Sequence, residues 1–167
     1  LKRKFFHHRY AGMPLECRGV LADYDSRTDS LTVWSSTQVV HWVRREISAA
    51  LKMPEERIRV IAPDVGGGFG VKGHVYPEDI LIAYLAKRLC RPIKWLEDRH
   101  EHFLNSAHSR DNHFDVEVGF ENDGRIVALK NSFLIDSGAY SPVGAAIAGN
   151  SIVHTLGPYD IEHYEAF

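Results

Sequence analysis

The stretch RIRVIAPDVGGGFGVKG, residues 57–73, joins a run of β-forming residues to a glycine-rich segment. RIRVIA at 57–62 predicts a β-strand, because valine and isoleucine side chains fit a pleated, half-buried surface. Four glycines in such a run cost folding entropy that other residues would avoid, which indicates a need for bare backbone. We interpret the run as a loop whose N–H groups approach an anion or a cofactor oxygen. Its residues are Gly66, Gly67, Gly68, Phe69 and Gly70.

The glycine run has three other interpretations: a turn without a ligand, a phosphate-binding P-loop and a dinucleotide-binding site. A tight strand-to-helix turn without a ligand needs no further residues. A phosphate-binding P-loop requires lysine directly after glycine and then a hydroxyl residue, but Val71 separates Gly70 from Lys72, so this alternative fails. Residues 68–73 match the dinucleotide pattern G-x-G-x-x-G, although the next helix is expected only at Pro77, which moves the helix dipole away from a pyrophosphate. The dinucleotide site stays the alternative.

Outward from the loop, the sequence predicts two helices and two hairpins. Apolar residues recur at three and four spacing over 38–52, which favours an amphipathic helix, and Pro77 with two acidic residues opens a second helix to about Leu89. ECRGVLADYD and LTVWSST form the first expected hairpin, and 111–120 with 125–136 form the second. Residues 93–97 predict a further strand.

These elements predict an α+β fold with a mixed sheet, two hairpins and two packed helices, as part of a larger domain. We expect residues 1–14 to be irregular and residues 15–167 to belong to one partial domain. The tail from Ser137, with Pro142 and Pro158, is expected to be loop with a short helix. Because Leu1 is not methionine and the chain stops abruptly at Phe167, we expect a fragment or a processed piece.

Composition excludes several classes of function. The 167 residues carry 20 basic and 22 acidic side chains, a net charge of -2, which gives no electrostatic reason to bind nucleic acid or an anionic membrane. Cys17 and Cys90 stand far apart, so the sequence predicts neither a disulfide framework nor a four-cysteine metal site. No apolar stretch approaches the roughly 20 residues of a membrane helix. We expect a cytoplasmic protein with a small-molecule or protein partner.

Polar clusters elsewhere do not assemble a base and a nucleophile. His100 and His102 flank Glu101, but they lack the ligand set that zinc demands, and a solvated face is the simpler interpretation. The pair Glu97 and Asp98 predicts a strand-end ion pair or helix cap. The three tryptophans fall on periodic apolar positions and are predicted to be core residues: Trp34, Trp42 and Trp95.

Several linked motifs resemble the large subunits of molybdenum hydroxylases, the family of xanthine dehydrogenase, aldehyde oxidase and carbon monoxide dehydrogenase. They occur in the family's order over nearly the whole chain from Pro14: LTVWSSTQ, PDVGGGFGVK, PIKWLEDR and DSGAY. Family members that oxidise xanthine or aldehydes often carry glutamate directly after this glycine stretch. Gly73 stands at that place here, which argues against purine specificity.

The resemblance implies a molybdenum cofactor, molybdopterin, bound without a side-chain ligand to the metal from this region. It implies that Gln38 donates its amide to an oxo ligand of molybdenum and that Phe69 and Gly70 approach the metal centre; a neutral amide can do this without replacing the ligand. Gln38 and Phe69 are thus the expected catalytic residues. The expected cofactor-binding residues are Gln38, Gly67, Gly68, Phe69 and Gly70.

The family also implies what must lie outside this chain. Iron–sulfur clusters and FAD are expected on partner domains or subunits, and the general-base glutamate is expected downstream, in the remainder of the molybdopterin-binding subunit. The predicted function is hydroxylation of a C–H bond of an aldehyde, an N-heterocycle or a related small substrate, with water as the oxygen source. The alternatives are a nicotinamide-dinucleotide-binding dehydrogenase domain and a non-catalytic subunit-assembly piece.

Overall fold

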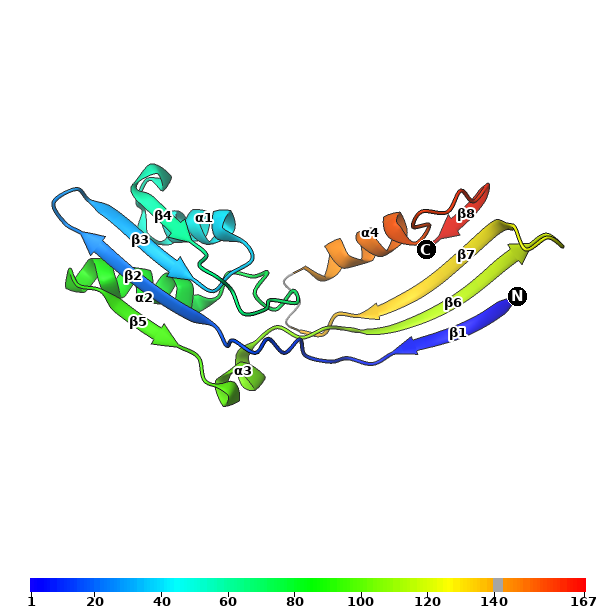
Figure 1. Ribbon diagram of the computed structural model, residues 1–167, viewed down its shortest axis with the longest axis horizontal. Helices are drawn as coiled ribbons and strands as arrows, with labels where there is room; N and C mark the ends of the chain where they lie inside the picture. Colours follow the sequence, from blue (N-terminus) through cyan, green and yellow to red (C-terminus); the bar gives the residue numbers. More distant parts are fainter. Residues whose placement is uncertain (140–142) are drawn as a thin grey trace. The chain divides into compact units, whose positions relative to one another are not determined.

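Two compact units make up the computed structural model, which describes residues 1–139 and 143–167 (Figure 1). Ala11–Ala107 form the first, here called the glycine-loop unit, and Leu1–Tyr10 with His108–Phe167 form the second, the long-hairpin unit. Both contain a four-stranded sheet with parallel and antiparallel pairs, so the predicted α+β class with mixed strand pairing is confirmed. The sequence predicted one mixed sheet, whereas the structure contains two.

The glycine-loop unit is built on the first predicted hairpin, whose strands are β2 (Gly19–Asp25) and β3 (Ser30–Ser35). The strand order in its sheet is β4-β3-β2-β5. Strand β4 (Ile58–Ile61) follows the short 3-10 helix Glu55–Arg57 and runs parallel to β3, whereas β5 (Ile93–Leu96) runs antiparallel to β2 at the other edge.

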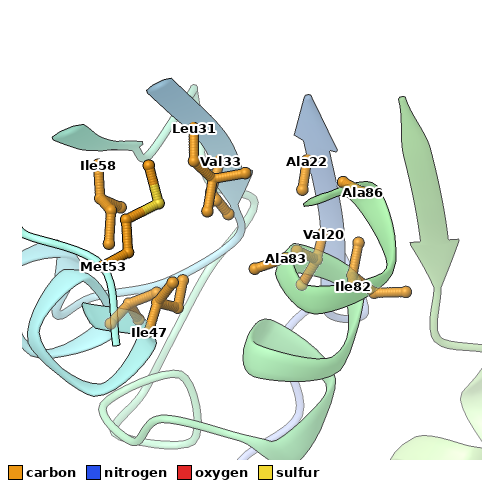
Figure 2. Packing of buried hydrophobic residues seen from close by; sticks show 11 residues of the cluster. Val20, Ala22, Leu31, Val33, Ile47, Met53, Ile58, Ile82, Ala83 and Ala86 are labelled. Atoms are coloured by element: carbon orange, nitrogen blue, oxygen red, sulfur yellow. The ribbon is translucent and has the colours of Figure 1, made fainter. Parts of the chain in front are cut away.

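Two helices cover one face of this sheet, as the periodicity predicts. Helix α1 (Val40–Leu51) connects β3 to β4, and helix α2 (Pro77–Leu89) connects β4 to β5. Alternate strand residues meet the inner faces of both helices, and this packing forms the apolar core (Figure 2). The core consists of Val20, Ala22, Leu31, Val33, Val43, Ile47, Met53, Ile58, Ile82, Ala83 and Ala86.

Helix α3 (Arg99–Asn105) was not predicted. It begins directly after β5, where the Asp98 side chain accepts a 2.8 Å hydrogen bond from the Glu101 N–H and the Glu101 side chain accepts one of 2.8 Å from the Asp98 N–H. This reciprocal arrangement is a capping box, which satisfies N–H groups that a helix start leaves free. The predicted cap role of Asp98 is therefore confirmed.

The long-hairpin unit contains the second predicted hairpin, β6 (Asp111–Phe120) and β7 (Ile126–Asp136). Its strand order is β1-β6-β7-β8. Strand β8 (His163–Ala166) pairs parallel with β7, and helix α4 (Gly144–His154) confirms the short helix expected in the tail. Tyr140 of DSGAY and Pro142 lie outside the described residues.

The prediction that residues 1–14 are irregular is wrong for β1 (Lys2–His7), which pairs antiparallel with β6 from Lys2 opposite Glu117 to His7 opposite Asn112. All six residues of β1 are exposed. An edge strand without a buried face needs no alternation of apolar and polar residues, so the usual sequence signal of a strand is missing. The assignment of residues 15–167 to one partial domain stays a prediction.

Candidate functional site

The glycine run lies in the loop of residues 62–76, between the end of β4 and the start of α2. Two tight turns shape it: the Val71 N–H donates to the Gly68 carbonyl at 2.9 Å, and the Gly73 N–H donates to the Gly70 carbonyl at 3.1 Å. Phe69 lies within the first turn, has φ of 51° and is 75% exposed. A bulky residue with positive φ has a strained backbone, and such strain together with an exposed aromatic ring is typical of functional sites.

The Gln38 side chain lies against the glycine run, which brings two widely separated predicted site regions together. The Gly70 N–H donates to Gln38 Oε1 at 3.1 Å. A Cβ placed on Gly68 would come within 2.4 Å of the same oxygen, so only glycine allows this approach. Gly70 has φ of 81°, and the space in front of it is open.

This contact fixes which way the amide of Gln38 points. A backbone N–H can only donate, so the atom facing Gly70 must be the carbonyl oxygen Oε1. The NH2 group of Gln38 is then turned away from that bond, and the residue is exposed. Gln38 therefore presents a neutral hydrogen-bond donor of fixed orientation next to Phe69 and Gly70.

Backbone contacts at Lys72 hold the chain before Gln38. The Lys72 carbonyl accepts a 2.9 Å bond from the Gln38 N–H and a 3.3 Å bond from Thr37 Oγ1, and Thr37 is itself buried. Neither Lys72 nor Thr37 was predicted as a site residue. The sequence did contain a signal, because Thr37 precedes Gln38 in STQ and Lys72 ends GGGFGVK.

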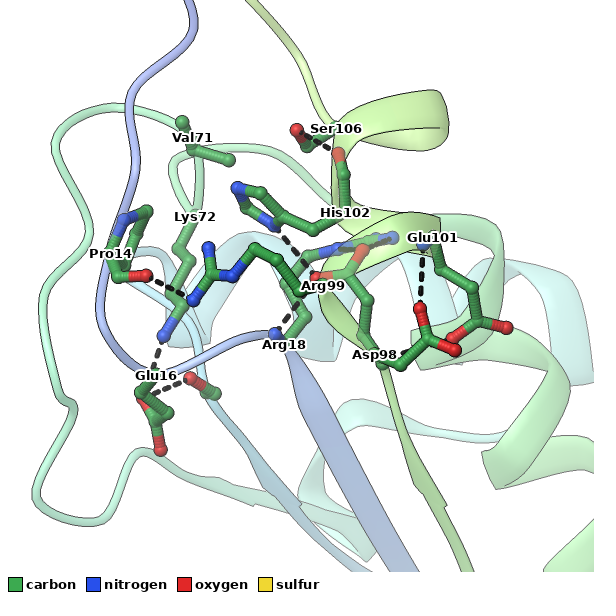
Figure 3. A network of polar contacts seen from close by, with 12 residues as sticks. Pro14, Glu16, Arg18, Val71, Lys72, Asp98, Arg99, Glu101, His102 and Ser106 are labelled. Atoms are coloured by element: carbon green, nitrogen blue, oxygen red, sulfur yellow. Dashed lines mark hydrogen bonds and ion pairs between the residues drawn. The ribbon is translucent and has the colours of Figure 1, made fainter.

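A buried charge network joins Arg18, which precedes β2, to Glu97 after β5 and to His102 on α3 (Figure 3). Arg18 donates to Glu97 through Nε at 2.8 Å and Nη2 at 2.6 Å, and His102 Nδ1 lies 2.9 Å from the other Glu97 oxygen. Burial alone would raise the pKa of Glu97, but the hydrogen bonds from Arg18 and His102 hold it below its ordinary value. The ion pair expected at Glu97 is confirmed.

The structure corrects two predictions, one in this network and one on α1. His102 is fully buried, so the solvated face predicted for the histidines is wrong there; its partner Glu97 compensates its burial. Trp42 is 47% exposed, and its assignment to the core is also wrong. Within residues 1–139 and 143–167, no three His, Cys, Asp or Glu side chains are grouped as metal ligands.

At the start of α2, polar groups connect the loop to the helix. Tyr76 Oη donates to the Val71 carbonyl at 2.6 Å, and its own N–H donates to Asp79 Oδ2 at 3.0 Å. Burial raises the pKa of Asp79 above its ordinary value, although Ser35 and the Tyr76 N–H donate to the carboxylate. The predicted helix start at Tyr76 and Pro77 is confirmed.

The residues present fit a bound molybdenum cofactor of the kind that the motifs imply. The site offers a neutral amide donor in Gln38 and open space where a Cβ on Gly70 would stand, so an electron-rich oxygen can approach the amide there. A donor set of this kind orients a metal's own ligands without displacing them.

Comparison with known proteins gives a consistent family. The model of the molybdopterin cofactor-binding domain matches residues 1–166. The large subunit of nicotine 6-hydroxylase from Paenarthrobacter nicotinovorans is 40% identical over 157 residues, covering 92% of this chain and 19% of that protein. Subunit gamma of the 6-hydroxypseudooxynicotine dehydrogenase complex from the same organism is 35% identical over 170 residues, covering 99% and 21%.

The fold agrees as well. Crystalline quinoline 2-oxidoreductase from Pseudomonas putida 86 superimposes with a TM-score of 0.81 at 36% sequence identity, covering 99% of this chain and 22% of that one. This chain belongs to the molybdopterin cofactor-binding domain family of the molybdenum hydroxylases. It spans about a fifth of the length of the relatives it matches.

Family membership displaces the dinucleotide-binding alternative, and the sheet gives the physical reason. In a dinucleotide-binding unit the glycines open the helix itself. Here α2 begins at Pro77, four residues after Gly73, and β5 lies at the opposite edge of the sheet from β4.

None of the described helices is long and apolar enough to cross a membrane.

Proposed function

We propose that this chain forms one wall of the cofactor site in the catalytic subunit of a molybdopterin-dependent hydroxylase. The enzyme would oxidise a C–H bond of an aldehyde, an N-heterocycle or a related small substrate, with oxygen derived from water. The observation that carries the proposal is the hydrogen bond from the Gly70 N–H to Gln38 Oε1, which turns the Gln38 NH2 outward. Molybdopterin, when bound, supplies the two-electron oxidation.

Each predicted site residue has a role that its geometry supports. Gln38 would donate from Nε2 to an oxygen of the bound cofactor, in an orientation fixed before binding. Gly68 and Gly70 let the backbone approach closely, and the exposed ring of Phe69 would cover one side of the substrate space. Gly67 has φ of 97°, which keeps the turn before Phe69 tight.

Among the substrate classes, N-heteroaromatic compounds have the most support. Two relatives are named for nicotine and quinoline, both of which contain an aromatic ring nitrogen. Electrons would leave through iron–sulfur clusters and FAD on partner domains or subunits, and the remainder of the molybdopterin-binding subunit would supply the general base. A cytoplasmic location is part of the same proposal.

The decisive experiment changes Gln38 in the purified holoenzyme. Gln38→Ala should lower the turnover number per molybdenum by about 10- to 1000-fold, by analogy with deletion of an oxyanion-hole donor. Gln38→Glu should be at least as damaging, because a carboxylate would face an electron-rich oxygen. The iron–sulfur and flavin absorption spectra should not change in either variant.

Asn105→Ala is the matched control, since it removes an exposed amide at the end of α3 in the same unit. Its turnover should equal that of the wild type. Wild-type turnover in both Gln38 variants would show that this side chain does not act at the cofactor. A holoenzyme without pterin or molybdenum would overturn the proposed function altogether.

A further inference from the structure

Lys72 is the largest fully buried side chain in the described chain, and it is charged. It follows the glycine run by two residues, and its Nζ lies 2.6 Å from Glu16 Oε2 (Figure 3). The Lys72 side chain is 0% exposed, whereas that of Glu16 is 40% exposed. A cation is rarely buried unless a partner and hydrogen bonds compensate the loss of water, so this pair has to be explained.

Glu16 gathers several donors from the loop and the sheet onto one oxygen. Besides Lys72 Nζ, its Oε2 accepts from Ser36 Oγ at 2.7 Å and from the Gly66 N–H at 2.9 Å. The Glu16 N–H also donates to the Gly66 carbonyl at 3.2 Å. Burial alone would raise the pKa of Glu16, but Lys72, Ser36 and Gly66 hold it below its ordinary value. Glu16 is therefore ionised and fixes the first glycine of the run.

The backbone of Lys72 fixes the other half of the site. Its carbonyl accepts hydrogen bonds from the Gln38 N–H and from Thr37 Oγ1. Lys72 thus connects Glu16 through its side chain to Gln38 through its main chain. The same carboxylate thus binds Gly66, the first residue of the glycine run, and Lys72, two residues after its last glycine.

We propose that Lys72 and Glu16 are positioning residues. Their ion pair, here called the clasp, ties Gly66 at the start of the glycine run to Lys72 just after it, and so sets where Gly70 holds the amide of Gln38. Stability alone does not account for the pair, because a buried ion pair is often replaced by apolar residues without loss of stability. The geometric contacts of Glu16 and Lys72 lead instead to Gly66 and Gln38. The catalytic part of this inference rests on the proposed function, whereas the clasp itself does not.

Hydrogen exchange and kinetics of the holoenzyme test the clasp together. In Lys72→Met, which keeps the length of the buried stem, peptides covering residues 63–73 should exchange about tenfold faster or more. The kcat per molybdenum should fall about 10- to 100-fold while KM changes less than about threefold, since small misplacements cost rate. The double variant Lys72→Met with Glu16→Gln contains neither charge and should recover stability, but neither slow exchange nor kcat.

Two further variants separate position from stability. Ile47→Ala makes a cavity in the core under α1, away from the loop, so it should lower the melting temperature with unchanged kcat and unchanged exchange over 63–73. Ser36→Ala removes one donor to Glu16 and tests the clasp even where Lys72→Met fails to fold; it should accelerate exchange over 63–73 about threefold.

The outcomes are distinct from those for the proposed function. Wild-type exchange over residues 63–73 in Ser36→Ala and in the double variant would overturn the clasp. Wild-type kcat in the double variant would overturn its positioning role, even with fast exchange. If the wild-type protein contains no pterin and no molybdenum, the proposed function fails, while the exchange measurements on that same protein still decide the clasp.

Discussion

The two units have sheets with the same number of strands, but they differ in how many apolar side chains they bury. In the glycine-loop unit, two helices pack on β2 and β3 and enclose eleven buried apolar side chains. Among the described residues of the long-hairpin unit, only Asn131 and Gly144 are buried, so this unit buries no apolar side chain there. Several of its large apolar residues are instead exposed, among them Phe5, Phe6, Leu134 and Val153.

This difference shows what strand pairing alone can and cannot supply. Continuous hydrogen bonding defines the long β6–β7 hairpin, yet burial of apolar surface is the main source of folding free energy. The candidate site lies in the unit that has the core. A loop that must hold Gln38 and Gly70 in a fixed relation needs rigid elements beneath it, and α1, α2 and β4 provide them.

The largest expected contrast concerns one ion pair from each unit. Glu97→Gln should lower the free energy of unfolding of the glycine-loop unit by about 3 kcal/mol, because the buried Arg18 then keeps only its ion pair with Glu78, which is 25% exposed. Glu165→Gln breaks the exposed pair with Lys130 and should cause no measurable loss in the long-hairpin unit. Native-state hydrogen exchange of the strand amides, measured separately for each unit, gives both values.

The pH dependence checks that the charge on Glu97 is the cause. The folded-state pKa of Glu97 lies below its ordinary value of 4.5, so its ionised form stabilises the unit above about pH 4.5. This contribution disappears as the pH falls through the folded-state pKa. The difference between wild type and Glu97→Gln should therefore shrink below pH 4.5, and a difference that stays constant down to pH 3 would contradict this explanation.

A pair of leucines in equivalent strand contexts tests the difference in packing. Leu31 on β3 is 1% exposed and Leu134 on β7 is 75% exposed. Leu31→Ala should destabilise the glycine-loop unit by about 2–5 kcal/mol through lost burial and a cavity. Leu134→Ala should change the other unit by less than about 0.5 kcal/mol in the exchange experiment. A large effect at Leu134 would mean that this side chain is covered in the holoenzyme.

Where the sequence predicted structure well, a local physical signal was present. The hairpins, both main helices and the start of α2 at Pro77 follow from alternation, three-and-four periodicity and helix-start residues. The glycine run was recognised as a candidate site because several adjacent glycines cost conformational entropy on folding. The proximity of Gln38 to Gly70 came only from the family resemblance, since no local pattern joins residues 32 positions apart.

Where prediction failed, the deciding contact was distant in the chain. Strand β1 exists because β6 offers it a partner more than a hundred residues away, not because of its own pattern. His102 is buried because its ring nitrogen contacts the carboxylate of Glu97, which Arg18 also binds. Sequence spacing alone could not show this contact. The burial of Lys72 was not predicted, because Glu16, whose carboxylate compensates the buried charge, lies 56 positions earlier in the chain.

The smallest expected difference in stability between the two units is that between two glycine variants, which separates turn geometry from function. Gly70 and Gly124 have φ of 81° and 89°, and a Cβ on either would meet no atom within 4 Å. Alanine at each position should therefore cost a similar 1–2 kcal/mol, roughly, from backbone strain alone. Gly124 lies in the β6–β7 turn of the long-hairpin unit, whereas Gly70 faces the open side of the candidate site. Only Gly70→Ala should then reduce pterin and molybdenum content and turnover in the holoenzyme. Equal cofactor content in the two variants, with equal losses of stability, would show that the glycine at position 70 serves the turn and not the ligand.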